Sequence, residues 1–189
     1  MTLQTEAPLE ALALNIYNRP IEGLLRDVAL GRTDLNPAYQ RGSVWSEDQR
    51  RGLVKSFIVG LPVPALIINA RWNADFADGG EYEYAVIDGK QRLEALAAFF
   101  DDNLSIPASW LPPQDVVTTI DTPDGAYVTY SGLSARRASR FKLAWAIPTV
   151  EAQLTTIREE AAMFQLVNTG GTPQTQTDLD RAAAVAQEA

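Results

Sequence analysis

The chain passes from an expected strand directly into an expected helix in one segment, Val86-Ile87-Asp88-Gly89-Lys90-Gln91-Arg92-Leu93. The apolar and aromatic residues that precede Asp88 predict a buried strand. Gly89 lets the backbone turn tightly and approach a ligand closely. The helix should run from about Gln91 to Phe100, because apolar residues at helical spacing give it one buried face.

The start of such a helix suits an anion. Its first N–H groups have no acceptor within the helix, and its dipole places partial positive charge there. Lys90 and Arg92 add formal charge, and an arginine can hold phosphate through two parallel hydrogen bonds. Asp88 could hold Mg²⁺ or accept a proton. The alternative is a plain Asp-Gly turn with a solvated first helical turn, and this spacing alone supports both equally.

Elements of both kinds are expected elsewhere, without a regular strand–helix–strand repeat. Ser46 and Gln49 form a capping-box pattern that starts a helix at about 47–59, which Gly60 ends. Residues 101–124, rich in Pro and Asp, are expected to be irregular. The other expected elements are helices from about 21, after Ser134, from Thr155 or Thr156 to near Asn168 and from about Thr177, and strands at 65–69, 126–130 and 144–150. This order predicts an α+β domain.

Composition excludes several kinds of chemistry. The chain has 189 residues, 46% of them hydrophobic and 21% charged, which fits one globular domain spanning 1–189. It has no Cys and no His, which rules out disulfides, thiolate chemistry, zinc–histidine sites and a Ser-His-Asp triad. The net charge of −8 counts against a sequence-nonspecific DNA binder. No apolar run is long enough to span a membrane and residues 1–14 do not form a signal peptide, so a cytoplasmic protein is expected.

Two further segments could face the same ligand. Tyr39-Gln40-Arg41-Gly42-Ser43-Val44-Trp45 places Arg41 just ahead of the capped helix. Its alternative is a loop with one exposed arginine, and Trp45 is assigned to the core. The segment from Phe164 to Pro173 places Asn168 before a Gly-Gly pair that could close over a ligand, although a glycine C-cap is favoured by local physics. A basic run, Arg136 to Lys142, is more typical of a solvated helix face than of a nucleic-acid contact.

Three motifs in order, YQRGSVW, VIDGKQRLEAL and FQLVNTGGTP, with GLPVP between the first two, resemble the DUF262 family. This family is the N-terminal domain of GmrSD-type modification-dependent restriction endonucleases, and the resemblance covers about residues 21–182. It implies a ParB/sulfiredoxin-like fold with a small mixed sheet flanked by helices. It also implies a D-G-Q-Q-R motif that binds and hydrolyses nucleoside triphosphates.

The resemblance assigns roles residue by residue. The D-G-Q-Q-R motif carries over to Asp88, Gly89, Gln91 and Arg92, while Lys90 stands where the family usually has Gln. The first motif carries over to Gln40 and Arg41, and the last to Asn168 and Gly170. Restriction members usually continue into an HNH nuclease domain, which needs His, so no HNH domain is expected here and a separate nuclease subunit could supply cutting.

The leading hypothesis is a bacterial or phage-encoded domain that binds, and could hydrolyse, a nucleoside triphosphate with Mg²⁺ in restriction or phage defence. Arg41, Lys90 and Arg92 would hold phosphates, together with Gly89 and Asn168 at the ligand. Asp88 would hold Mg²⁺ or orient water, and Gln40 and Gln91 would orient water or the ligand. The alternative is a non-catalytic, ParB-like module that binds DNA or recruits a partner, or a phage-encoded regulator of such a system. A nuclease site within this domain ranks last.

Overall fold

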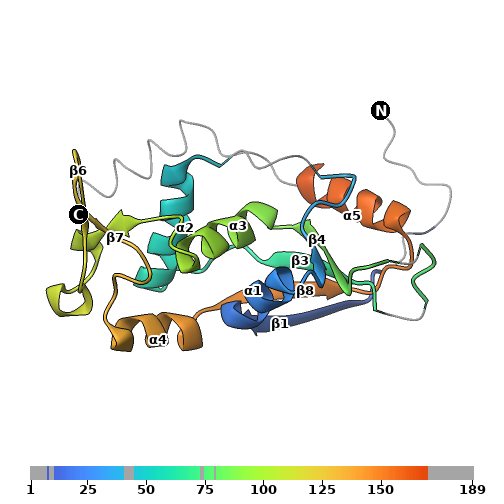
Figure 1. The fold of residues 1–189 in the computed structure, drawn as a ribbon. Coiled ribbons are helices and arrows are strands. Elements are labelled where there is room, and N and C mark those ends of the chain that lie inside the picture. Colours follow the sequence, from blue (N-terminus) through green and yellow to red (C-terminus); the bar gives the residue numbers. More distant parts are fainter. Residues whose placement is uncertain (1–7, 9–10, 41–44, 73–74, 79, 170–189) are drawn as a thin grey trace.

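The computed structural model describes residue 8 and residues 11–40, 45–72, 75–78 and 80–169 (Figure 1). Its strands are β1 (Leu14–Pro20), β2 (Thr33–Asp34), β3 (Leu66–Ala70), β4 (Tyr84–Asp88), β5 (Ile106–Pro107), β6 (Ile120–Thr122), β7 (Gly125–Val128) and β8 (Ala146–Ala152). Its helices are α1 (Ile21–Ala29), α2 (Glu47–Val59), α3 (Lys90–Phe100), α4 (Ala135–Ala144) and α5 (Ile157–Thr169), with short 3₁₀ turns η1 (Ala108–Trp110) and η2 (Pro113–Asp115).

The main sheet is mixed and has the strand order β1-β8-β3-β4-β2. β1 pairs antiparallel with β8, β8 parallel with β3, β3 antiparallel with β4, and β4 parallel with β2. A smaller antiparallel sheet has the order β5-β7-β6. This arrangement confirms the expected α+β class with a mixed sheet and flanking helices.

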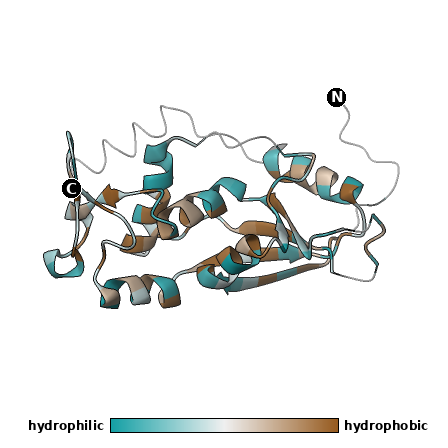
Figure 2. Cartoon of the chain, in the orientation of Figure 1, coloured by the Kyte–Doolittle hydropathy of each residue, from teal (hydrophilic) through white to brown (hydrophobic). Residues whose placement is uncertain are grey.

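Helices cover both faces of the main sheet. Leu24 of α1 and Leu93 of α3 pack with Leu66, Val86 and other residues on one face. On the opposite face, residues of α5 pack against Ile87 of β4, Ala152 of β8 and Leu154. In Figure 1, α5 lies above the strands of the main sheet and α1 overlaps β8 and β1, and Figure 2 shows hydrophobic residues along the strands.

A second apolar cluster lies where α2, α3 and α4 meet the smaller sheet. Phe99 of α3 is fully buried at its centre, and its ring lies 5.9 to 6.4 Å from the rings of Tyr130, Phe141 and Trp145. Aromatic pairs at such separations add to the stabilisation that burial gives. This cluster fixes α3, and α3 in turn places the segment after Asp88.

Local signals set the ends of α2. The Ser46 hydroxyl accepts a hydrogen bond from the Gln49 backbone, and the Gln49 side chain accepts one from the Ser46 backbone, which together form the expected capping box. Gly60 ends the helix in the left-handed conformation, with φ of 76°. The prediction for this helix is confirmed at both ends.

Other sequence expectations need correction. Residues 101–124 were expected to be irregular, but they contain β5, β6 and two 3₁₀ turns. β1 was not expected at all. The alternation in Leu14-Asn15-Ile16 is too short to mark a strand, and in the structure every residue of β1 except Arg19 is exposed. The helix expected from about Thr177 lies outside the described residues. Within the described part of the chain, no helix is both long and apolar enough to cross a membrane.

Replacing Phe99 with Ala should destabilise the domain by about 3–5 kcal/mol, because it leaves a cavity among three aromatic rings. Leu143→Ala is the matched control, since Leu143 is 74% exposed and its truncation should change stability by less than about 0.5 kcal/mol. Urea unfolding of both variants gives the comparison. Equal stabilities of the two would show that Phe99 does not organise this cluster.

Candidate functional site

A cavity of about 540 Å³ opens where β4 ends and α3 begins. Three parts of the chain form its walls: the β4–α3 junction, the residues on either side of the 41–44 gap, and the second half of α5. The residues that line it are Gln40, Trp45, Ile87, Asp88, Gly89, Lys90, Gln91, Arg92, Phe164 and Asn168. The structure therefore brings together all of the predicted site residues that lie within its described part.

Gly89 makes the turn between the strand and the helix. Its φ is 97°, in the region that favours glycine. A Cβ at this position would lie 2.8 Å from Cδ1 of Leu66 and 3.1 Å from Nη1 of Arg92. Both the backbone conformation and the available space therefore require glycine at position 89. The tight turn at Gly89 places the first helical turn of α3 at the cavity.

Asp88 and Arg92 face each other across this turn. Nη2 of Arg92 donates to Oδ2 of Asp88 at 2.5 Å, and Nη1 donates to the carbonyl of Ala65 at 3.1 Å. The guanidinium is thus held by two partners and is largely buried. The pair orients the carboxylate and leaves Oδ1 of Asp88 with no hydrogen-bond partner among the described residues.

Gln40 is fastened to the end of β4. Its Nε2 donates to the carbonyls of Val86 and Ile87, the latter at 2.9 Å. The register of β4 against β3 shifts at this point, between Ile67 and Ile68. Such an irregularity changes the direction of a strand's backbone groups and is often found next to functional sites. Because Nε2 is the donor here, Oε1 of Gln40 is left as an acceptor at the cavity.

Gln91 connects the first turn of α3 to the start of α2. Its Oε1 accepts a hydrogen bond of 2.6 Å from the backbone N–H of Trp45. Trp45 is half-buried, packs against the core around Phe99 as expected, and also lines the cavity. The amide of Gln91 is therefore oriented by the backbone next to the 41–44 gap.

Lys90 lies at the cavity, but its ammonium is directed to a structural partner. Nζ donates to Oδ1 of Asn36 at 2.6 Å and lies 3.9 Å from Oε1 of Glu94. The residue is 8% exposed, so burial and these partners hold it in place. Lys90 therefore contributes positive charge near the site from a fixed position.

Helix α5 supplies the remaining wall. Phe164 and Asn168 stand one turn apart on one face of this helix, and both line the cavity. Nδ2 of Asn168 donates to the carbonyl of Phe164 at 2.7 Å. Sequence reasoning had found Asn168 but had missed Phe164 and the cavity role of Trp45. An aromatic residue that lines a cavity has the same local sequence pattern as one in the core.

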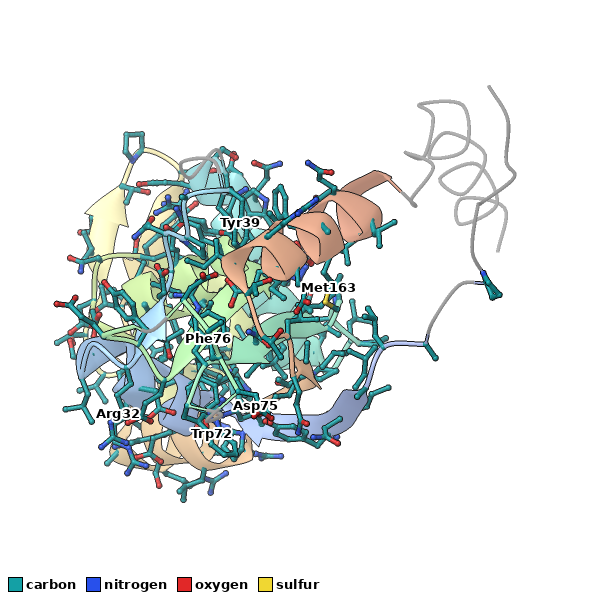
Figure 3. All side chains as sticks on the ribbon, turned by 90° about the vertical axis from the view of Figure 1, so that its right-hand side faces the viewer. Arg32, Tyr39, Trp72, Asp75, Phe76 and Met163 are labelled. Atoms are coloured by element: carbon teal, nitrogen blue, oxygen red, sulfur yellow. The ribbon has the colours of Figure 1, made fainter. Side chains whose placement is uncertain are left out.

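A buried carboxylate anchors α5 to the sheet. Glu160 has no exposure, and Arg71, directly after β3, donates to both of its oxygens, at 2.8 and 2.6 Å. Asn69 donates to Oε1 at 2.8 Å, and the Tyr39 hydroxyl donates to Oε2 at 3.2 Å. Left without partners, such a carboxylate would cost several kcal/mol. Figure 3 shows Tyr39 beside α5, the helix that carries Met163 and Glu160.

This environment affects the protonation of Tyr39. Burial, and then the charge of Glu160, raise the pKa of Tyr39 well above its ordinary value. The hydrogen bond to Glu160 similarly raises the pKa of Arg71. Tyr39 therefore stays a donor and Arg71 a cation at neutral pH.

Two predicted residues fall outside the described part of the chain. Arg41 and Gly170 lie in the ranges 41–44 and 170–189, although Gln40 and Trp45, on either side of the first range, both line the cavity. Within the described residues, no group of three or more acidic side chains could hold a metal ion alone. A metal at Asp88 would need ligands from a bound molecule or from water.

A family model described as the N-terminal domain of GmrSD restriction endonuclease matches residues 21–184. The chain belongs to this family. The match includes all three cavity walls of the GmrSD N-terminal domain and excludes β1. Comparisons with curated proteins and with solved structures returned no match.

Gly89→Ala should lower stability by about 1–3 kcal/mol, because alanine is strained at this φ and its Cβ would displace Leu66 or Arg92. Gly52→Ala is the control: Gly52 lies inside α2 with no atom near the new Cβ, so the change should be neutral or stabilising by up to about 1 kcal/mol. Thermal unfolding of the two variants measures the difference. A Gly89→Ala protein as stable as the Gly52→Ala protein would contradict the packing described here.

Stability should fall as the pH rises above about 10, where an unfolded tyrosine ionises but Tyr39 in the folded domain does not. Below that pH, the contribution of Tyr39 to the stability of the fold is fully present. As the pH rises from there toward the pKa of Tyr39 in the folded domain, this contribution is lost. Tyr17, whose pKa is raised to about 12, acts in the same direction. Urea unfolding at pH 9 and at pH 11 measures the free energy of unfolding, which should fall less between the two pH values in Tyr39→Phe than in the wild type. An unchanged loss would mean that Tyr39 is not held protonated by the fold.

Proposed function

We propose that the cavity binds the triphosphate of a nucleotide together with Mg²⁺, and that the domain serves in this way in a restriction or phage-defence system. The observation that carries the proposal is the geometry of Asp88. Arg92 holds one carboxylate oxygen and leaves the other without a partner among the described residues, at a cavity that also contains the first turn of α3. Membership of the GmrSD N-terminal family supports the biological setting.

The cavity has the size and the groups that such a ligand needs. A volume of about 540 Å³ lies within the range of small-molecule sites. The turn at Gly89 lets a phosphate approach the start of α3, where the helix dipole favours negative charge. Oδ1 of Asp88 would bind Mg²⁺, and the phosphates and water would complete its coordination, as is usual for this ion.

The structure changes the division of roles among the cations. Arg92 is engaged by Asp88 and Ala65, so in this proposal it orients Asp88 first and contacts phosphate only if it exchanges partners. Lys90, held by Asn36, supports the site by its charge. Gln40 and Gln91 would position water or the ligand through amides that hydrogen bonds to the backbone have already oriented. Phosphoryl transfer depends mainly on such positioning and electrostatics, so hydrolysis is compatible with a site without histidine.

The proposal includes the ParB/sulfiredoxin-like fold that the family resemblance implies. Its support is the mixed sheet with helices on both faces and a cavity at the strand-to-helix turn. Experimental coordinates of a liganded form would test this assignment by structural superposition.

Titration of the four ribonucleoside triphosphates, with and without Mg²⁺, tests the proposed site. At least one should bind more tightly with Mg²⁺. Asp88→Asn should remove this Mg²⁺ dependence, weaken binding in Mg²⁺ about tenfold or more, and abolish any phosphate release. Binding without metal should be equal or stronger, because the variant removes a negative charge beside the phosphates.

The matched control is Asp121→Asn, the same charge change at an exposed carboxylate on β6, which should leave binding and its Mg²⁺ dependence unchanged. The proposal fails if the wild type binds none of the four nucleotides. Retained Mg²⁺ dependence in Asp88→Asn would exclude Asp88 as the metal ligand.

A further inference from the structure

One face of α5 carries three polar or aromatic residues at intervals of four: Glu160, Phe164 and Asn168. Residues at this spacing lie above one another along a helix. The first is fully buried, while Phe164 and Asn168 line the cavity. The rotation of α5 about its axis, which Glu160 can set, therefore decides what this wall presents to a ligand.

The contacts of Glu160 fix that rotation. Oε1 accepts from Asn69 and from Nε of Arg71, and Oε2 accepts from Nη2 of Arg71 and from the Tyr39 hydroxyl. Each oxygen thus receives two hydrogen bonds, which is the full capacity of a carboxylate. Hydrogen bonds weaken steeply when their angle or length changes, so four of them to one buried group restrict the rotation of α5 beyond what apolar packing does.

Tyr39 extends this anchor to a second wall. Its ring lies 5.6 Å from the ring of Phe164, and its hydroxyl reaches Glu160. The next residue in the chain is Gln40, whose amide is fastened to the end of β4 and lines the cavity. One side chain therefore contacts both the buried end of the α5 face and its cavity-lining part.

We propose that Glu160 is a positioning residue for the nucleotide site, acting through Tyr39 to hold Gln40 and the Phe164–Asn168 wall of α5 as one unit. This inference rests on the proposed function of the cavity. Glu160 is not among the residues that line the cavity, so it would not touch a nucleotide bound there. Its effect on binding is transmitted by the placement of two walls that are far apart in the sequence.

Three variants separate positioning from general stability. Tyr39→Phe removes one hydrogen bond and keeps the ring against Phe164. Glu160→Gln keeps the size of the side chain, but replaces one accepting oxygen with a donor, so at least two of the four donors lose their acceptor. Tyr17→Phe is the control: Tyr17 lies on the edge strand β1, and the change removes its hydrogen bond of 2.6 Å to Glu151 of the neighbouring strand β8.

The first measurement needs no ligand. Hydrogen exchange of the intact chain should show faster exchange, about tenfold, in two places at once in Glu160→Gln: the second half of α5 and the segment around residues 39–40. Tyr17→Phe should leave both at the wild-type rate. Faster exchange in α5 without a change at 39–40 would overturn the inference, because the two walls would then be independent.

The second measurement is the affinity for the nucleoside triphosphate that binds the wild type with Mg²⁺. Tyr39→Phe should bind it about three- to tenfold more weakly, the equivalent of one hydrogen bond, while unfolding within a few degrees of the wild type. A double variant that combines Tyr39→Phe with Glu160→Gln should bind the nucleotide no more weakly than Glu160→Gln alone, because both changes break the same connection. Wild-type affinity in Tyr39→Phe, or losses that multiply in the double variant, would overturn the inference.

The two proposals fail in different ways. A wild-type chain that binds none of the nucleotides overturns the proposed function, and the exchange measurement still decides whether Glu160 holds the two walls together. Should Glu160→Gln not fold, Tyr39→Phe decides by both measurements, with faster exchange at 39–40 and weaker binding expected, and wild-type behaviour contradicting the inference. Binding that depends on Asp88 but not on Tyr39 or Glu160 leaves the site standing and removes the positioning role.

Discussion

The backbone at Gly89 must turn through a conformation, and a space, that only glycine fits. With φ of 97° and Leu66 within 2.8 Å of where a Cβ would lie, the chain leaves β4 and enters α3 within a single residue. Because the turn is so short, the carboxylate at the end of the strand and the guanidinium in the first helical turn meet directly. Every wall of the cavity is arranged around this junction, since Gln40, Trp45 and Phe164 all line it together with Gly89.

The electrostatics of the cavity follow from that pairing. A cation placed beside Asp88 by the fold is already neutralising it, so a triphosphate entering the cavity meets few uncommitted positive groups among the described side chains. In the proposed site, helix N–H groups and a divalent ion supply the attraction that the side chains do not. This is consistent with a chain whose net charge is −8, because a metal bridges acidic protein groups and acidic phosphates.

Features encoded by neighbouring residues were predictable, and features encoded by distant ones were not. The capping box at Ser46, the glycine turn and the strand–helix junction each depend on a few consecutive residues, and each was predicted correctly. β1 was not found, because its apolar alternation stops after Leu14-Asn15-Ile16 and the strand, which lies at the edge of the sheet, is almost entirely exposed. For the cavity, local sequence pattern pointed to Asp88 and Gly89, and the family resemblance added Gln40. Neither could show that the charge of Lys90 is held by Asn36, or that Arg92 is held by Asp88 and Ala65.

The buried carboxylate of Glu160 could not be predicted for the same reason, because its partners are distant in the sequence. Its donors come from three places in the sequence, at Tyr39, Asn69 and Arg71, and nothing local distinguishes Glu160 from the solvated Glu159 beside it. A buried ion pair is weak support for stability, since apolar side chains of similar volume often stabilise a fold as well. Its directional bonds nevertheless define the rotation of a helix, which apolar packing leaves less determined. Glu160 lies one and two helical turns before Phe164 and Asn168, which line the cavity, and the proposed positioning role gives a reason for a charged group at this place that stability alone does not.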